Sequence, residues 1–125
     1  MKQRPRIVKD KKVRAFVATV RAVWGFERVF KSYIHSEESG GLWAYVRHLS
    51  QNEIIRARQV QNPETTKFVI AYSPKITTDL YLEYGGKTFK VVSIDPFEYN
   101  KTDLTIRAEE VSPPTFDEVE YEEAT

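Results

Sequence analysis

Cysteine is absent from this sequence, and so is any long apolar run. Without cysteine the chain forms neither disulfides nor thiolate metal sites, and a small secreted domain usually needs such staples. No segment approaches the roughly 20 apolar residues that a membrane-spanning helix requires, and residues 1–12 are too polar for a signal peptide. We therefore expect synthesis in the cytoplasm and no membrane partner.

Sequence motifs for catalysis are also missing. The two histidines, His35 and His48, have no second type of ligand at metal-binding spacing beside them, whereas zinc needs three or four N or S ligands. Neither glycine pair, 40–41 or 85–86, is followed by the lysine and serine or threonine of a phosphate-binding loop. No G-x-S-x-G nucleophile turn occurs. We predict a protein that is not an enzyme, with no cofactor, no metal and no catalytic residue.

The apolar residues that are present favour β-structure. They make up 41% of the 125 residues, with 13% aromatic, and phenylalanine, tyrosine, valine and isoleucine dominate. A chain of this length fits one domain, because two independent cores would each be too small. The predicted fold class is mainly β: a small β-barrel or sandwich with one short α-helix and flexible charged termini.

Charge is distributed unevenly between the two ends. Residues 1–31 hold ten lysines and arginines against two acids, whereas residues 113–125 hold five acids and no base. Opposite charges suit head-to-tail stacking of subunits, although two solvated tails would give the same pattern. We expect a basic flexible arm over residues 1–12, a β-domain over 13–111 and an acidic flexible tail over 112–125.

Alternating apolar residues and turn signals divide the domain into strands. The first segment also has a helical alternative, because its apolar residues are dense. Gly85-Gly86 predicts a tight two-residue hairpin turn, since both positions of the favoured turn need positive φ. The predicted strands are 13–24, 26–35, 42–49, 67–72, 80–84, 88–95 and 103–109.

A capping box predicts the single helix. The Ser50 hydroxyl can accept a hydrogen bond from the Glu53 amide, while the Glu53 carboxylate accepts one from the Ser50 amide. The helix then runs to about Val60 and ends before Asn62-Pro63, because proline disfavours helical geometry at the preceding residue.

Binding of single-stranded nucleic acid is the alternative function. A small β-barrel with surface aromatic and basic side chains can stack bases and follow a phosphate backbone. The body interleaves its basic residues with acids and threonine, and the net charge of +1 argues against a continuous basic groove. The residues that could form such a surface are Tyr45, Arg47, Lys67, Tyr72, Lys87, Phe89 and Lys90.

Four motifs between Trp43 and Glu110 occur in a fixed order. Together they resemble the head-tail joining or head-closure (head completion, stopper) proteins of tailed bacteriophages. The order of the pieces carries the resemblance, because none is specific alone. The motifs are AYVRHLSQNEIIRARQ (residues 44–59), TKFVIAY (66–72), ITTDLYLEYGGKTFKV (76–91) and SIDP (93–96).

This resemblance implies a structural virion protein. It implies a homo-oligomeric ring, twelve-fold in this family, beneath the portal and adaptor proteins, which closes the DNA-filled head and receives a tail completion protein or the tail. The chain would lie near packaged DNA. By position, Asp79 ends the loop before the hairpin, and Gly86-Lys87 makes its turn. The candidate interface residues are Arg47, Arg56, Arg58, Asp79, Asp95, Phe97 and Tyr99.

Overall fold

The computed structural model describes residues 7–48, 65–96 and 102–123, and these residues form eight strands and no helix. The seven strands predicted from alternation are confirmed, including the first, for which a helix was the alternative. The helix expected to begin at Ser50, with Glu53 as its capping partner, lies outside the described residues. The strands are β1 (Lys11–Val23), β2 (Phe26–Tyr33), β3 (Leu42–His48), β4 (Thr65–Ala71), β5 (Tyr81–Tyr84), β6 (Lys87–Pro96), β7 (Asp103–Val111) and β8 (Glu118–Glu120).

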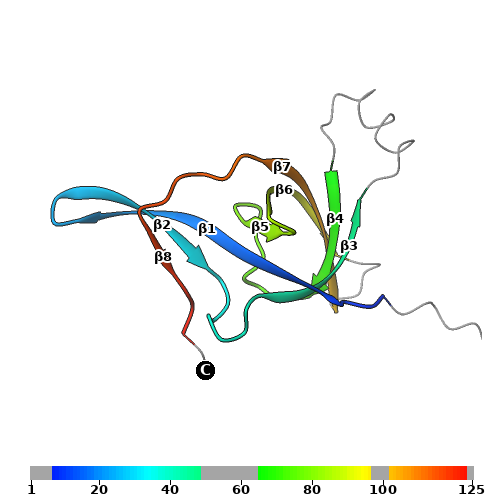
Figure 1. Cartoon of the computed structure of the whole chain (residues 1–125). Helices are drawn as coiled ribbons and strands as arrows, with labels where there is room; N and C mark the ends of the chain where they lie inside the picture. Colours follow the sequence, from blue (N-terminus) through cyan, green and yellow to red (C-terminus); the bar gives the residue numbers. More distant parts are fainter. Residues whose placement is uncertain (1–6, 49–64, 97–101, 124–125) are drawn as a thin grey trace, which may run out of the picture.

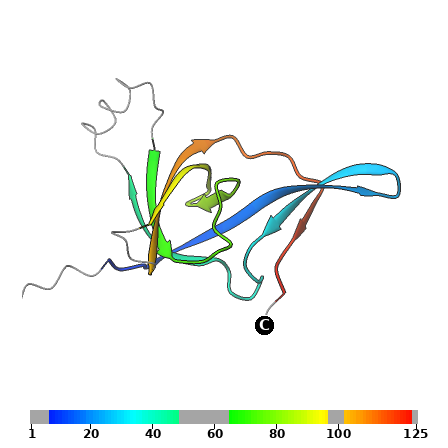
Figure 2. The same cartoon turned by 180° about the vertical axis from the view of Figure 1, so that it is seen from behind.

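All eight strands belong to one sheet. Their order is β3-β4-β7-β6-β5-β1-β2-β8, and a further pairing between β1 and β3 closes six of them into a ring. Every pairing is antiparallel except that of β2 with β8. Figures 1 and 2 show the closed part of the sheet on one side and the β1–β2 hairpin extending from it. The predicted mainly β class is therefore confirmed.

The core fills the interior of this ring. Because side chains alternate across a strand, one face of each strand points inward. Phe68 of β4 lies opposite Ile106 of β7, and Leu82 of β5 lies opposite Phe89 of β6. All four are almost fully buried, and the Phe68 and Phe89 rings meet edge to face with centroids 5.3 Å apart. Burying each such side chain contributes about 1.5–3 kcal/mol, which makes this ring the stable body of the protein.

Three glycines, at two places, fix the local geometry of the sheet. Gly85 and Gly86 have φ of 61° and 76°, and Tyr84 pairs with Lys87 on either side of them, so the predicted hairpin turn is confirmed. Gly41 has φ of 134°, and a Cβ there would lie 2.5 Å from the carbonyl oxygen of Val13 in β1. Its missing side chain therefore lets the start of β3 approach β1 and close the ring.

Both ends of the chain differ from the expected charged arms. Strand β1 begins at Lys11, so Lys11 and Lys12 of the predicted arm pair with Ala44 and Trp43 of β3. At the other end, the segment expected to trail from the body as an acidic tail instead forms β8, which pairs with β2. Tertiary contacts order these polar residues although their composition predicts no strand.

Candidate assembly surfaces

The β1–β2 hairpin projects from the closed ring (Figure 1), and large apolar side chains near its end are exposed. The last pair of β1 with β5 is at Phe16, and β1 continues to Val23, seven residues further. At 3.3 Å per residue the hairpin reaches about 23 Å beyond that pair. Near its end Trp24 is 95% exposed, Phe26 72% and Val20 55%. Two strands without further support are only marginally stable in water, and exposed groups of apolar side chains usually mark an interaction site. Exposed aromatic rings at the end of such a hairpin are therefore unusual.

The turn at the hairpin end adds backbone strain to this exposure. Val23 pairs with Phe26, so Trp24-Gly25 is a two-residue turn, and both residues have positive φ, 52° and 81°. Turns of this type favour asparagine, aspartate or glycine, and positive φ is strained for a bulky side chain. The predicted strands 13–24 and 26–35 leave Gly25 between them, but the exposed turn at Trp24 was not predicted, because tryptophan is not a typical turn residue.

The C-terminal segment docks along the base of this hairpin. The Val29 amide donates to the Asp117 carboxylate and the Asp117 amide donates to the Val29 carbonyl, both at 2.9 Å. Glu120 accepts hydrogen bonds from Ser32 and Arg21, each at 2.6 Å. These hydrogen bonds lower the pKa of Glu120 below the usual glutamate value, and the bond from Ser32 has the largest effect. The segment is therefore held by specific contacts that its sequence did not reveal.

Aromatic stacking completes the docking of this segment. The Tyr121 ring stacks on Tyr33 at a centroid distance of 4.8 Å, and Phe116 meets Phe16 edge to face at 5.5 Å. Offset and edge-to-face pairs contribute about 0.5–1.5 kcal/mol beyond the area they bury. The hairpin base, unlike its end, is thus covered by the protein itself.

A partly buried polar network joins the hairpin base to β5. Lys31 donates to Glu83 at 2.6 Å, and the Tyr33 hydroxyl donates to the other oxygen of the same carboxylate. Burial lowers the pKa of Lys31, but its hydrogen bonds to Glu83 and Tyr33 outweigh this and raise it. Burial, with the bond to Glu83, raises the pKa of Tyr33. The network keeps Lys31 charged and fixes the hairpin relative to the ring, which is a positioning role.

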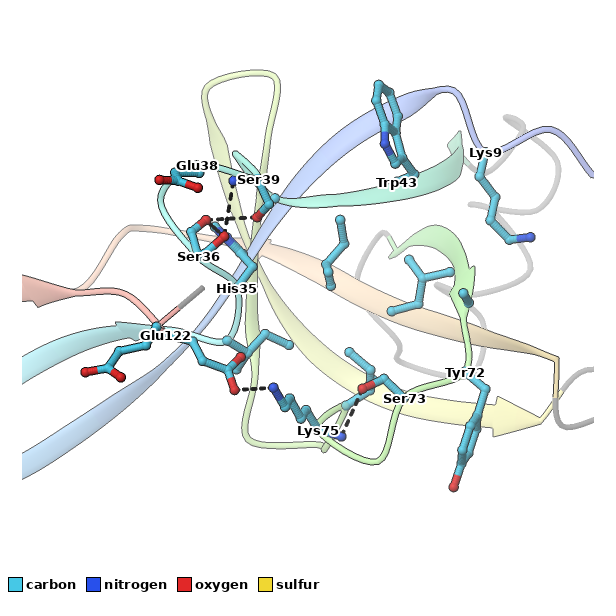
Figure 3. Close-up of a pocket in the computed structure, with 17 residues that line it drawn as sticks. Lys9, His35, Ser36, Glu38, Ser39, Trp43, Tyr72, Ser73, Lys75 and Glu122 are labelled. Atoms are coloured by element: carbon cyan, nitrogen blue, oxygen red, sulfur yellow. Dashed lines mark hydrogen bonds and ion pairs between the residues drawn. The ribbon is translucent and has the colours of Figure 1, made fainter. Parts of the chain in front are cut away.

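A pocket of about 850 Å³ opens near the start of β3 (Figure 3). Its lining includes four aliphatic side chains, which come from the β2–β3 connection, β3, β4 and the loop before β5: Ile34, Leu42, Ile70 and Ile76. Acidic side chains from the loop after β2 and from the C-terminal segment also line it: Glu38, Glu122 and Glu123. The pocket therefore combines an apolar lining with carboxylates.

His35 lines the same pocket and is only 5% exposed. Its Nδ1 lies 3.0 Å from the Ser36 carbonyl oxygen, and its Nε2 has no hydrogen-bond partner within the described ranges. In those ranges no three histidine, cysteine, aspartate or glutamate side chains are grouped to bind one metal ion. Likewise, none of the described residues forms a helix long and apolar enough to cross a membrane.

The predicted interface residues are distributed over several elements. Arg47 on β3 and Asp95 on β6 are exposed, and Asp79 accepts a hydrogen bond from Thr77 in the turn before β5. Strand pairing does not bring these three together. The remaining candidates lie outside the described residues: Arg56, Arg58, Phe97 and Tyr99. Their proposed roles in assembly stay predictions.

The residues suggested for nucleic-acid binding do not form one surface. Phe89 is 3% exposed and belongs to the core, so it cannot stack on a base, and its assignment to the surface was wrong. Lys87 lies 3.5 Å from Glu110, and Lys90 lies over the Tyr81 ring. The pairing register does place Arg47, Lys67 and Arg107 side by side on β3, β4 and β7.

The model of the phage head completion protein family matches residues 35–111, more than half of the chain. This chain belongs to that family. The resemblance seen in the motifs between residues 43 and 110 is thereby confirmed. The chain is a structural protein of the phage head, and its family is not known as an enzyme family. The β1–β2 hairpin and β8 lie outside the matched residues.

Two solved structures share the fold of this head completion protein. One is a chain in the virion of a native gene transfer agent particle, with a TM-score of 0.56 and 19% identity, covering 86% of this chain and 98% of that one. The other is protein SF1141 from Shigella flexneri 2a, with a TM-score of 0.52 and 17% identity, covering 82% and 95%. No curated protein matches the sequence. At these identities the two structures establish the fold alone.

Proposed function

We propose that this head completion protein is a ring-forming subunit of the head–tail connector. The ring, twelve-fold in the simplest form, sits beneath the portal and adaptor proteins, closes the DNA-filled head and provides the surface to which the tail or a tail completion protein attaches. The subunit is made in the bacterial cytoplasm and acts in the virion. Family membership supports a place in the head, and the gene transfer agent chain supports a place in a particle.

One observation carries the connector role: the molecule presents a projecting apolar end and a separate open pocket. A protein that functions alone rarely exposes large aromatic side chains on a two-stranded projection, because the exposure costs solubility and gains nothing. Two different surfaces on one subunit are what head-to-tail assembly requires, and such contacts close into rings when the rotation between subunits permits.

Genetic complementation tests this function. A phage that lacks the gene should produce filled heads that lose DNA and do not join tails, and the intact chain supplied in trans should restore both. Packaged DNA is measured by nuclease protection, and joined tails are counted by electron microscopy. Normal DNA retention and tail joining without the chain would contradict the proposal.

The cross-strand basic row gives the second candidate, binding of single-stranded nucleic acid. Arg47, Lys67 and Arg107 are neighbours across three strands, so they place three positive charges in a row that a phosphate backbone could follow. Fluorescence anisotropy with single-stranded DNA over a salt series tests it. Binding that weakens with salt and with Lys67→Ala supports this candidate, and no binding at low salt excludes it.

A further inference from the structure

The end of the β1–β2 hairpin carries two independent costs at one residue. Trp24 has positive φ, which is strained for a residue with a large side chain, and it is 95% exposed, which leaves its indole in water. Asparagine or glycine would remove both costs. Tryptophan is among the residues that contribute most to binding energy at interfaces, because it buries a large rigid surface. A contact made in the assembled state would offset both costs.

We propose that this hairpin end, defined by Trp24 in the turn and by Phe26 and Arg28 on one face of β2, inserts into the pocket lined by Ile34, Leu42, Ile70 and Ile76 of a second copy of the chain. The inference rests on the proposed function and names the contact between neighbouring subunits of the ring. The pocket volume of about 850 Å³ is large enough for an indole and a phenyl ring together. Because Ile70 and Ile76 are only 3% and 8% exposed, the apolar contact surface comes mainly from the half-buried Ile34 and Leu42 and from the exposed Trp43 and Tyr72, which also line the pocket.

Charge at the two surfaces is complementary. Arg28 lies in the third pair from the turn, opposite Arg21, which is already bound to Glu120. The exposed Glu27 is nearer the turn but lies on the opposite face of the hairpin from Arg28. Among the described residues Arg28 has no ion-pair partner, and the same holds for Glu38 and Glu123 in the pocket lining. Docking would bring the guanidinium of Arg28 near these two carboxylates.

The lysines of the pocket do not cancel this complementarity. Lys9 is bound to Asp103 at 2.9 Å, and Lys75 is bound to Glu122. The carboxylates that remain outside these pairs are therefore the charges that an arriving arginine meets. Charge complementarity of this kind steers association and fixes register, while the buried aromatic rings supply most of the affinity.

Geometry favours a second copy over the same copy. The hairpin extends about 23 Å beyond its last pair with β5 and points away from the ring, whereas the pocket lies at the start of β3. Figures 1 and 2 both show the hairpin end remote from the β2–β3 connection. A projection and a pocket at different places on one molecule give a head-to-tail contact, in which every subunit uses both surfaces once.

Crosslinking tests the contact directly, because the chain has no cysteine of its own. Glu27→Cys labels the hairpin end and leaves Trp24 in place, and Ser39→Cys labels the pocket. The two purified full-length variants are mixed at high concentration with a short bismaleimide. Crosslinked dimer should form about tenfold more with Ser39→Cys than with Val92→Cys, an exposed control on β6.

Adding Trp24→Asn to the Glu27→Cys chain should abolish this preference. The same substitution should leave the melting temperature unchanged or higher, because asparagine suits the first position of the turn. A destabilising substitution cannot produce that combination of results. Crosslinking that is equal with and without the Trp24→Asn substitution, or equal for pocket and control cysteines, would overturn the proposed contact.

Complementation separates this inference from the proposed function. Suppose that the intact chain restores head closure but the pocket cysteine crosslinks no better than the control cysteine. This result would overturn the contact and leave the connector role standing. Failure of the intact chain to restore closure would remove the connector role itself. Trp24→Asn should fail to restore closure although it is folded, and full closure with this variant would also overturn the contact.

Discussion

Replacing Gly41 with alanine should destabilise the closed ring of strands. Gly41 precedes β3 with φ of 134°, and a Cβ there would lie 2.5 Å from the Val13 carbonyl oxygen. That oxygen cannot easily move away, because Val13 is 1% exposed and pairs with Leu42 at the β1–β3 junction. The junction is the contact that closes the ring.

Two terms set the expected size of this effect. Backbone strain at positive φ costs about 1–3 kcal/mol for a residue with a side chain. Forcing extra volume into a well-packed site costs about 1–3 kcal/mol more. The free energy of unfolding should therefore fall by about 2–6 kcal/mol for Gly41→Ala.

Gly25→Ala is the matched control. Gly25 also has positive φ, 81°, but a Cβ there meets no atom within 4 Å, so only the strain term applies. Urea unfolding of both variants should show Gly41→Ala to be less stable by the packing term, about 1–3 kcal/mol. In thermal melts this difference corresponds to about 3–10 °C for a domain of this size. Equal destabilisation by the two substitutions would refute the reasoning about the close approach.

Three further predictions concern the C-terminal segment and the second hairpin. Tyr121→Ala should lower the free energy of unfolding by about 1–2 kcal/mol, because the ring that stacks on Tyr33 is lost. Hydrogen exchange of the Glu122 amide, which donates to the His35 carbonyl, should accelerate. Unchanged exchange would show that Tyr121 does not hold the C-terminal segment. Since the pKa of Glu120 is lowered, its contacts stabilise docking above pH 4.5, the ordinary glutamate value, and this contribution disappears as pH falls below it. NMR shifts of Tyr121 should report release of the C-terminal segment in acid, and Glu120→Gln should remove the pH dependence of these shifts. An identical titration in both proteins would show that Glu120 does not control the docking. Gly86→Val should cost about 1–3 kcal/mol, because valine is strained at φ of 76°, and an unaltered melting temperature would contradict that conformation.

The strands of the ring were predictable because their sequences carry the signals that determine them. Alternation in β4 and β7 places one face in the core, and Gly85-Gly86 permits the turn between β5 and β6. Those signals depend on neighbouring residues alone, so they can be recognised in the sequence without the structure. The family resemblance depends on the same segments and was predictable for the same reason.

The candidate surfaces were less predictable, because they depend on contacts between distant residues. Strand β8 contains only Glu118, Val119 and Glu120, and its docking needs Val29, Ser32 and Arg21 from the hairpin. The pocket combines residues from the two ends of the chain and from the middle. Trp24 was hidden by its residue type, since a turn at tryptophan contradicts local preference. That contradiction is a usable signal, because natural sequences break local rules mainly at functional sites.

Strand β1 also gives the molecule a mechanical property. It runs without interruption from Lys11 to Val23 and pairs in turn with β3, β5 and β2. A force applied at Trp24 therefore acts on a lever about 23 Å long, whose fulcrum is the pairing with β5 at Phe16. Because the inner part of β1 pairs with β3 from Lys11 to Val13, beside Gly41, a pull on the outer end loads the same hydrogen bonds that close the ring.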